Sequence, residues 1–411
     1  MFLTFLRDPA WLSKQRLWCY ATILIAVSFA VVIWVLSGHG VNDPTGRLVG
    51  TDFISFWTVS WSLFHGHARD VYAPVALAGL EQTVVPREDT AFYAWQYPPT
   101  ALLIVYPLAI LPYLWSLAIW LLTGLTGYLS ALWRISPHSL TLWVGAAFPA
   151  VLLTVIHGQN ALLTTSLLAW AFILLADRPI LAGILVGLLS FKPHLGLLLP
   201  IALIAGRYWR TITSAALTGL GLAVATILLF DPDVWSDFFA STSFSQQILD
   251  SGLVPYYKMQ SVFAALRLLG APLPLAYSGQ ALSAAAAAAI VAWVWGHRGV
   301  AEMKYATLVS AIPLATPFFL DYDLMIIAPA IAWLALKSIQ NGPLPWERTA
   351  LVASFIVPLI SRSFAEHTHI LLAPVVISAL LAAVVARIYA EHDIRDGANS
   401  GLSAWRVRPA A

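Results

Sequence analysis

Charged residues are scarce in this chain. Its 411 residues include 22 Lys or Arg and 20 Asp or Glu, which together make up 10% of the sequence. A soluble domain has about 25% charged residues, so water is not the main solvent of this protein. The formal net charge of +2 is too small to indicate a nucleic-acid partner. We therefore expect a protein of the membrane bilayer that binds no nucleic acid.

Cysteine is nearly absent as well. The only cysteine, Cys19, lies inside an apolar run, so neither an intramolecular disulfide nor a cysteine zinc site is possible. His65 and His67 are two positions apart and would need further ligands to hold a metal ion. We expect neither a metal nor a cofactor.

Long apolar runs dominate what remains. Hydrophobic residues make up 60% of the chain and its mean hydropathy is +0.79. The 18 tryptophans fit a protein with two membrane–water interfaces. An apolar helix needs about 20 residues to cross the hydrocarbon core. Candidate spans lie near residues 17–37, 112–133, 140–156, 160–176, 211–230, 272–295, 303–319, 323–337, 347–361 and 370–388.

The stretch 180–206 fits either one long crossing or two short helices broken at Phe191-Lys192-Pro193-His194. Lys and Arg concentrate in cytoplasmic loops, so their distribution distinguishes the two. Two short helices give 15 Lys or Arg inside and 7 outside, whereas one long helix gives 8 inside and 13 outside. Pro193 also favours the break, because proline kinks or ends a helix.

The sequence therefore predicts an all-α integral membrane protein with about 12 transmembrane helices, forming one domain over residues 1–411. Both termini lie in the cytoplasm, and residues 390–411 form a polar cytoplasmic tail. Two long outer segments, about 38–111 and 231–271, carry interfacial helices. Because 13 of the 20 Asp and Glu residues fall on the outer side, we expect the functional site there.

Asp52 follows the first predicted span, in the segment GTDFISFW. The aromatic residues beside it belong at the membrane interface, where a carboxylate is partly desolvated and holds a proton more readily. Such a carboxylate suits a general base. The alternative is a solvated aspartate that caps the following helix.

Six blocks of sequence carry a resemblance to a known family. The first contains a D-F-x-x-F motif followed by L-x-x-G-x-x-x-x-x-Y-x-P, at Asp52, Phe53, Phe56, Leu63, Gly66, Tyr72 and Pro74. The others are YPPTALLIVYPLAILPY at 97–113, GQNALL at 158–163, LAGILVGLLSFKPHLGLLLP at 181–200, YYKMQSVFAALRLLG at 256–270 and PFFLDYDLMIIAPAIAWL at 317–334. In this order, over most of its length, the chain resembles glycosyltransferase family 87.

The resemblance implies a membrane-embedded enzyme of the GT-C type. Such an enzyme moves a sugar, most familiarly mannose, from a polyprenyl-phosphate donor to a hydroxyl of a lipid or glycan acceptor. The resemblance also implies that Asp52 is the general base of an inverting reaction. We accordingly expect a bacterial inner (plasma) membrane protein whose active site faces the periplasm.

Lys192 is the first candidate for the donor phosphate. It lies between the two short helices, near the outer interface, where an unpaired ammonium is costly. A phosphate would satisfy it, and His194 would add a donor. The alternative is a lysine that snorkels to the headgroups. Lys258 and Arg362 are further phosphate candidates, although both can be ordinary surface charges.

Sugar or acceptor hydroxyls have candidates in a turn between two spans, His157-Gly158-Gln159-Asn160. Gln159 and Asn160 can bond hydroxyls, or they can simply cap the next helix. Tyr97, which opens the second matching block, is assigned with them.

A second outer turn contains Asp321 and Asp323. We expect sugar binding or helix capping here rather than a metal, because a lipid monophosphate donor needs no metal bridge. The family often has a histidine just before this triplet, where this chain has Leu320. His367 and His369 are candidates to replace it in space.

Two other classes remain open. A secondary transporter also has about twelve spans, but transporters usually carry ionisable residues near the midplane and paired repeats with broken helices. A non-catalytic lipid-binding protein would keep the fold without activity, and the presence of Asp52 argues against it.

Overall fold

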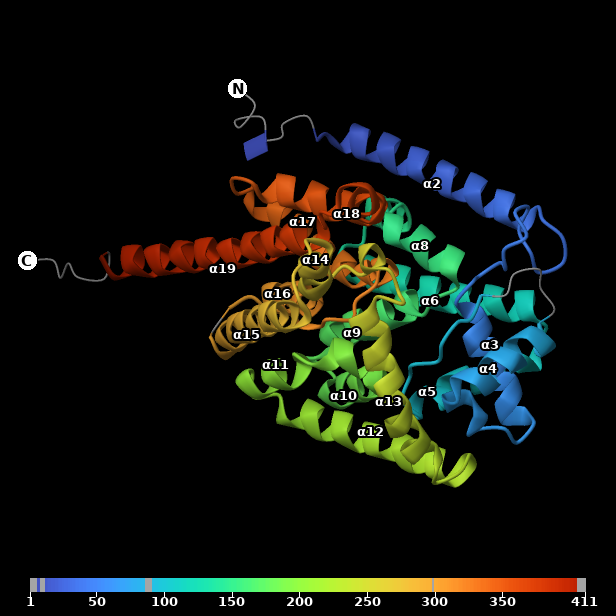
Figure 1. The fold of residues 1–411 in the computed structure, drawn as a ribbon. Helices are drawn as coiled ribbons and strands as arrows, with labels where there is room; N and C mark the ends of the chain where they lie inside the picture. The colour runs from blue at the N-terminus through green and yellow to red at the C-terminus, as the bar shows by residue number, and fades with distance from the viewer. Residues whose placement is uncertain (1–5, 8–11, 86–90, 298, 405–411) are drawn as a thin grey trace, which may run out of the picture.

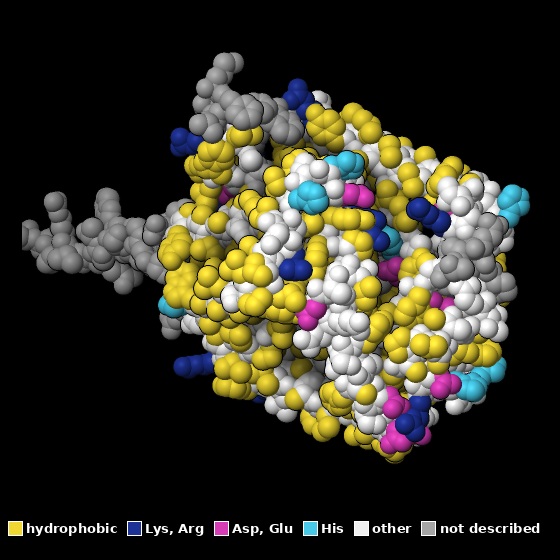
Figure 2. Space-filling model, viewed as in Figure 1, with side chains coloured by type: hydrophobic (Ala, Val, Ile, Leu, Met, Phe, Trp, Pro, Cys, Tyr) yellow, Lys and Arg dark blue, Asp and Glu magenta, His cyan; other side chains and the backbone are white. Residues whose placement is uncertain are grey.

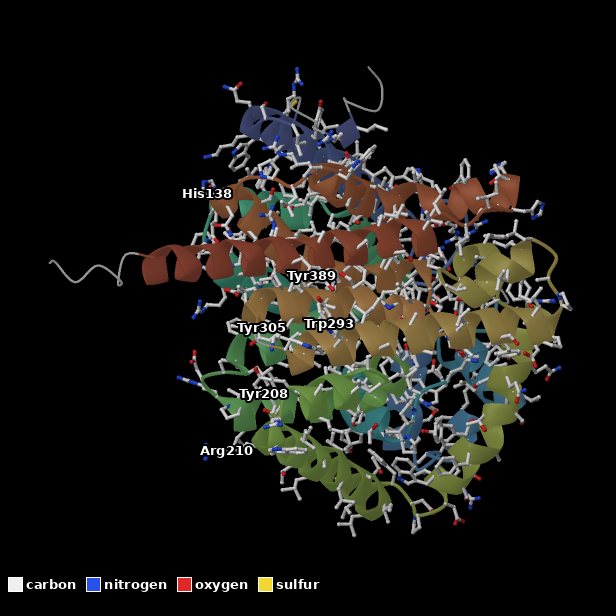
Figure 3. The ribbon with its side chains drawn as sticks, turned by 90° about the vertical axis from the view of Figure 1, so that its left-hand side faces the viewer. His138, Tyr208, Arg210, Trp293, Tyr305 and Tyr389 are labelled. Carbon is white, nitrogen blue, oxygen red and sulfur yellow. The ribbon has the colours of Figure 1, made fainter. Side chains whose placement is uncertain are left out.

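The computed structural model describes residues 6–7, 12–85, 91–297 and 299–404, with side chains up to residue 391. In this part of the chain the regular structure is helical, and extended backbone pairs only at two isolated bridges, Asn42–Leu48 and Met259–Leu320. Figure 1 shows one packed body of helices with α2 along its upper edge and α12 along its lower edge. The same edges are seen after the 90° turn of Figure 3.

Seven helices within the described residues are long and apolar enough to cross a membrane, and the bent pair of α7 and α8 would make an eighth. The seven are α2 (Lys14–Leu36), α6 (Tyr113–Ile135), α12 (Trp209–Leu229), α15 (Leu273–Gly296), η6 with α17 (Asp321–Ile327 and Ala328–Asn341), α18 (Glu347–Thr368) and α19 (Ala373–Ala404). The other helices of the bundle are α7 (Ser139–Ala146), α8 (Pro149–His157), α9 (Ala161–Leu174), α10 (Pro179–Leu188), α11 (Leu199–Ala205) and α16 (Ala301–Ala315). This is the fold of a multi-pass membrane protein, while the number twelve stays a prediction.

Burial separates central helices from peripheral ones. In α2 only Ala21 is buried, and in α12 only Thr211 and Thr226 are. A helix that is apolar on all sides and buries almost none of them against protein needs lipid as its solvent. By contrast, α16 buries nearly every side chain from Met303 onward, packed between α15, α17 and α19.

The helix that begins at Pro179 breaks at Lys192, as the two-helix alternative predicts. Two short 3₁₀ turns, η3 (Leu189–Phe191) and η4 (Pro193–Gly196), separate α10 from α11. The hydroxyl of Thr211, at the start of α12, donates to the carbonyl of Pro179 at 3.0 Å, and that of Ser214 donates to Ile180 at 2.8 Å. Helices α10 and α12 therefore start at the same end of the bundle. Because α11 ends just before α12 begins, the chain runs away from that end along α10 and returns to it along α11.

The loops predicted to be cytoplasmic meet at that end. The Lys304 ammonium donates to the carbonyl of Trp295 at 3.1 Å, and the ring of Tyr208 lies 5.9 Å from that of Trp295. Figure 3 shows Tyr208, Arg210 and His138 on the same side of the molecule. Basic residues thus gather at one end of the bundle.

The two predicted outer segments lie together away from this end. The first contains α3 (Phe53–Phe64), η1 (Asp70–Tyr72), α4 (Pro74–Val84), α5 (Thr100–Val105) and η2 (Tyr106–Ile110), and the second contains α13 (Val234–Ser251), η5 (Tyr256–Lys258) and α14 (Val262–Leu268). Arg69 joins them through ion pairs with Asp233 at 2.9 Å and Asp237 at 2.6 Å. In Figure 2, which has the same view as Figure 1, acidic, basic and histidine side chains lie near the middle, among hydrophobic ones.

Some predicted boundaries are wrong. The span expected over 140–156 is two helices that meet at 50°, because Pro149 starts α8 and cannot continue the backbone ladder of α7. Helix α18 extends past residue 361 to Thr368. Helix α19 continues into the predicted cytoplasmic tail as far as Ala404, and residues 405–411 of that tail lie outside the described residues.

Candidate active site

The site begins where α3 starts against the turn after α8. The Asp52 amide donates to the carbonyl of His157 at 3.0 Å, which joins the two segments. Gly50 and Gly158 have φ values of +70° and +63°, which favour glycine. A Cβ at position 158 would lie 2.6 Å from that of Phe53, so only glycine allows this approach.

Asp52 is not a helix cap. It occupies the N-cap position of α3, but its side chain makes no capping hydrogen bond. Its Oδ2 accepts instead from Nε2 of Gln159 at 2.9 Å, and its Oδ1 lies 3.4 Å from the Thr51 hydroxyl and 3.9 Å from Nδ1 of His157. The Asp52 side chain is 24% exposed, so an incoming substrate can reach it. The capping alternative from the sequence is therefore wrong for this carboxylate.

Tyr97 lies behind Asp52, between two amide side chains. Its hydroxyl donates to Oε1 of Gln159 at 3.3 Å and accepts from Nδ2 of Asn160 at 3.0 Å. Burial, reinforced by the negative charge of Asp323, raises the pKa of Tyr97 well above its ordinary value. The hydroxyl consequently stays protonated and remains a donor. Asn160 makes no capping bond to α9.

Lys192 already has a carboxylate partner. Its ammonium donates to Oδ1 of Asp323 at 2.6 Å and to Oδ1 of Asn160 at 2.8 Å, and it lies 5.7 Å from the centre of the Tyr322 ring. Lys192 and Asp323 are both buried. The expectation that Lys192 needs a phosphate to satisfy its charge, or snorkels to the headgroups, is corrected by this buried pair.

The turn at residues 320–323 is held by its own carboxylates. Asp323 Oδ2 accepts from the Leu320 amide at 3.2 Å, and Asp321 Oδ1 accepts from the Tyr322 amide at 2.9 Å. Asp321 Oδ2 accepts from Nη1 of Arg362 at 3.1 Å. Each carboxylate is therefore engaged by the turn and by a cation. Among the described residues, no three His, Cys, Asp or Glu side chains gather as metal ligands.

The remaining phosphate candidates are Arg362, Lys258 and His194. Arg362 keeps a 32% exposed side chain beside Asp321. Lys258 is half-buried next to Met259, whose backbone pairs with Leu320, and no hydrogen bond or ion pair within the described residues engages its ammonium. His194 lies in η4, and its buried Nε2 has no hydrogen-bond partner among the described residues.

The histidine ring beside the 320–323 turn is that of His157, whereas the sequence analysis named His367 and His369 as candidates. The centroid of the His157 ring lies 5.8 Å from that of Tyr322. Its Nδ1 lies 3.0 Å from the Thr51 hydroxyl. His367 bonds the carbonyl of Ser363 in its own helix, and His369 ends that helix. Thr51 and Tyr322 are site residues that the sequence reasoning missed, although each sits directly beside a predicted aspartate.

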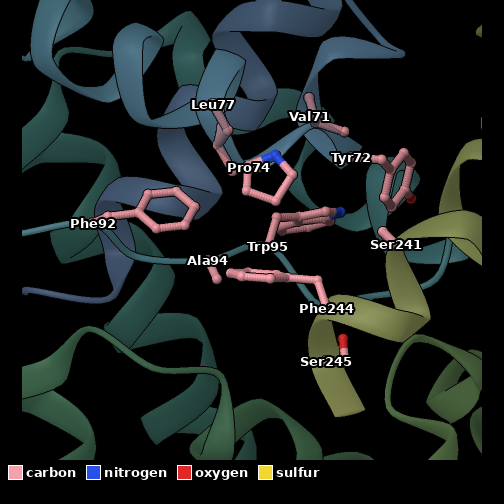
Figure 4. A pocket seen from close by; sticks show the side chains of 10 residues that line it. All are labelled: Val71, Tyr72, Pro74, Leu77, Phe92, Ala94, Trp95, Ser241, Phe244 and Ser245. Carbon is pink, nitrogen blue, oxygen red and sulfur yellow. The ribbon is translucent and has the colours of Figure 1, made fainter. Parts of the chain in front are cut away.

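Two small apolar crevices lie on this side of the molecule, and the inner one includes residues of the polar group. The inner one is lined by Phe56, Ile104, Trp120 and Phe191, and it ends at Tyr97 and Asn160. The outer one lies between the first outer segment and α13, where Figure 4 shows Phe92 and Trp95 facing Phe244 and Ser241. Trp95 lines both. The inner crevice thus places aromatic and aliphatic side chains next to Tyr97 and Asn160.

Comparison with known proteins adds one finding. Residues 95–317, more than half of the chain, match the family model described as glycosyltransferase family 87. The matched range contains Tyr97, the 157–160 turn, Lys192 and Lys258, while Asp52 and the 320–323 turn lie outside it. Searches of curated proteins and of solved structures found no match.

Proposed function

The chain belongs to glycosyltransferase family 87 and is a membrane glycosyltransferase, and on this premise we propose that it moves a hexose, with mannose as first choice, from a polyprenyl-phosphate donor to an acceptor hydroxyl. The observation that carries the proposal is the Asp52 carboxylate. It is accessible, it caps no helix, and it lies next to Thr51, His157 and Gln159.

In the proposed reaction Asp52 is the general base. The acceptor hydroxyl gives its proton to Asp52 while its oxygen attacks the anomeric carbon. The bond between that carbon and the phosphate oxygen breaks, and polyprenyl phosphate leaves with the bonding electrons. The acceptor attacks on the face opposite the leaving group, so the anomeric configuration is inverted. Inverting glycosidases work in the same way, with a base that activates the nucleophile on the opposite face of the sugar ring.

The leaving phosphate needs cations, and the half-buried Arg362 and Lys258 suit it better than the buried Lys192. Arg362 uses one nitrogen for Asp321 and keeps its others, and Lys258 makes no ion pair within the described residues. Lys192 is buried and neutralised by Asp323. We therefore assign the phosphate to Arg362 and Lys258, with His157 as a third donor near Asp52.

The apolar crevice that ends at Tyr97 and Asn160 supports a lipid-linked substrate. A prenyl chain that packs against these apolar side chains keeps its carbons away from water, which is favourable in proportion to the buried area. Its phosphate end would then lie beside the polar group.

We further propose that the site faces the periplasm of a bacterial inner membrane, with both termini in the cytoplasm. The gathering of basic residues at the opposite end of the bundle supports this orientation, because Lys and Arg concentrate on the cytoplasmic side. Arg210 and Lys304 belong to that end.

A donor assay on detergent-purified protein tests the function. The protein is incubated with a polyprenyl-phosphate hexose or with a nucleotide hexose, and lipid and glycan extract of host membranes supplies acceptors. We expect consumption of the lipid-linked donor, release of polyprenyl phosphate and an inverted linkage in the product. Use of the nucleotide sugar alone would contradict the proposed donor, and retention of configuration would contradict the proposed mechanism.

A further inference from the structure

Two amide side chains connect Asp52 to Lys192. Gln159, Asn160 and Lys192 are 6%, 3% and 3% exposed, so these side chains lie almost entirely inside the protein. The sequence suggested them as ligands of sugar and phosphate. Their surroundings suggest another task.

The bonds between them all point one way. Lys192 donates to Oδ1 of Asn160, whose Nδ2 donates to Tyr97. The Tyr97 hydroxyl donates to Oε1 of Gln159, whose Nε2 donates to Asp52. An ammonium can only donate and an ionised carboxylate can only accept, so the two ends fix both amide orientations. Hydrogen bonds aligned in one direction polarise and strengthen one another.

The side-chain amides of Gln159 and Asn160 have few hydrogen-bonding positions left for a substrate. Oε1 of Gln159 accepts from both Tyr97 and the Asn160 amide, and its Nε2 is engaged by Asp52. Both ends of the Asn160 side chain are engaged as well. A sugar hydroxyl that used either oxygen would compete with one of these buried bonds, which is costly where water cannot replace it.

Asp323 anchors the far end of the series. It holds the Lys192 ammonium at 2.6 Å and is itself fixed by the backbone of its turn. If the ammonium were lost, Asn160 could turn its amide over and accept from Tyr97. Tyr97 would then no longer donate to Gln159, and the Gln159 side chain would lose one of the bonds that hold its Nε2 against Asp52.

We propose that Gln159 is a positioning residue that holds the Asp52 carboxylate in place, and that Lys192 acts on Asp52 through Asn160 and Tyr97 rather than by touching the donor phosphate. This rests on the proposed function in one respect, the role of Asp52 as the base. Gln159 thereby sets the direction in which Asp52 meets the acceptor hydroxyl.

Gln159→Leu tests the near end of the series. We expect kcat per folded molecule to fall by about ten- to a hundredfold, the range of one hydrogen bond to a charged group, while KM for the polyprenyl-phosphate donor changes less than about twofold. Gln280→Leu is the matched control: that buried glutamine bonds the backbone of Phe263 and Leu314, so its loss should lower stability but not kcat.

Tyr97→Phe is the second variant, in case Gln159→Leu does not fold. It keeps the ring and removes only the hydroxyl between the two amides, and we expect the same split between kcat and KM. A rise in donor or acceptor KM at unchanged kcat would instead make these residues substrate ligands. Unchanged constants in both variants would also overturn the proposal.

Lys192→Met tests the far end, compared with Lys192→Met/Asp323→Asn. We expect Lys192→Met to lower kcat and the melting temperature at unchanged donor KM, because it leaves a buried carboxylate unpaired. Neutralising that carboxylate in the double variant should restore the melting temperature. A tenfold rise in donor KM in Lys192→Met, reversed by Lys192→Arg, would overturn the proposal in favour of phosphate binding.

A failure of the proposed function and a failure of this inference would give different results. A parent protein that uses no polyprenyl-phosphate sugar would contradict the proposed function. The melting temperatures of the Lys192 and Asp323 variants need no substrate. If the double variant stayed as unstable as Lys192→Met, the anchoring pair, and with it this inference, would be wrong whatever the reaction.

Discussion

Asp52 differs from most other described carboxylates of the predicted outer side in its bonding partners. Asp43 accepts from the amides of Thr45 and Arg47 and so closes a turn, and Asp70 pairs with His67. Others pair with cations or hydroxyls: Asp233 and Asp237 with Arg69, Asp250 with Tyr277, Asp321 with Arg362 and Asp323 with Lys192. Asp52 is instead held by the side-chain amide of Gln159, with Nδ1 of His157 3.9 Å from its Oδ1.

The paired state of Asp321 and Asp323 predicts the effect of chelation. Both carboxylates are engaged by a cation and by backbone amides, and a divalent metal would have to displace Arg362 and Lys192. Cationic side chains can stabilise the leaving phosphate without a metal ion. Turnover in excess EDTA should therefore equal turnover without it. Loss of activity that magnesium or manganese restores would instead make these two aspartates metal ligands.

Part of the site could be predicted residue by residue. Asp52, Gln159 and Asn160 stand in short motifs beside glycines, and the structure brings all three together. The pairing of Lys192 with Asp323 could not be predicted, because the residues are 131 positions apart and no local pattern links them. Tyr322 could not be identified from the sequence, because no local pattern predicts that its ring lies beside the Lys192 ammonium and the His157 ring.

The turn between α8 and α9 shows how one glycine positions the site. Gly158→Ala would place a Cβ 2.6 Å from that of Phe53 and push the turn away from Asp52. We expect turnover per folded molecule to fall strongly, since Gln159 moves with the turn. Gly40→Ala is the control: its φ is also +63°, but no atom lies within 4 Å of the added Cβ.

Gly40→Ala should lower the free energy of unfolding by roughly 1–2 kcal/mol, because alanine disfavours the left-handed backbone, and it should leave turnover unchanged. Kinetics and thermal unfolding of both variants check this. Equal turnover in Gly158→Ala and Gly40→Ala would mean that the approach of the turn to Asp52 does not matter.

Helix α13 is held over the outer crevice by few contacts. Only Val234, Ile248 and Leu249 are buried in it, near its two ends. Near its start, Arg69 pairs with Asp233 and Asp237, and the ring of Phe238 contacts that of Tyr72. The ion pairs are exposed to water, so salt should screen them.

Loss of these ion pairs should loosen the helix. In Arg69→Gln, amides of residues 234–251 should exchange faster with deuterium than in the parent. Added salt should speed exchange in the parent and have less effect in the variant. Arg47→Gln, an exposed arginine of the same segment, is the control and should leave exchange in α13 unchanged. Equal exchange in all three proteins would show that Arg69 does not hold α13.

Proline marks the breaks between short helices in this protein. Pro193 led to the correct break near Lys192. Pro149 carries the same signal, yet the span over 140–156 was predicted as continuous and is bent by 50°. The lengths of the short helices depend on packing against neighbours, which hydropathy alone does not contain.

The molecule as a whole has a basic end and an end that carries the proposed site, and labelling with an impermeant thiol reagent tests which faces the outside. In a Cys19→Ser background, we expect Thr45→Cys and Gly270→Cys to react in intact bacteria. His138→Cys and Arg210→Cys, at the opposite end, should react only after the cells are opened. Labelling of position 210 but not 45 in intact cells would reverse the orientation.

The central claim is that Asp52 is the base of the transfer reaction, and turnover of Asp52→Asn tests it most directly. The amide keeps the shape of the side chain but cannot take a proton at this position. General-base contributions are typically about a hundred- to ten-thousandfold, so turnover should fall within that range while donor affinity stays the same. Asp70→Asn, an exposed carboxylate paired with His67, should turn over normally. Near-normal turnover of Asp52→Asn, at donor affinity equal to that of the parent, would contradict the assignment.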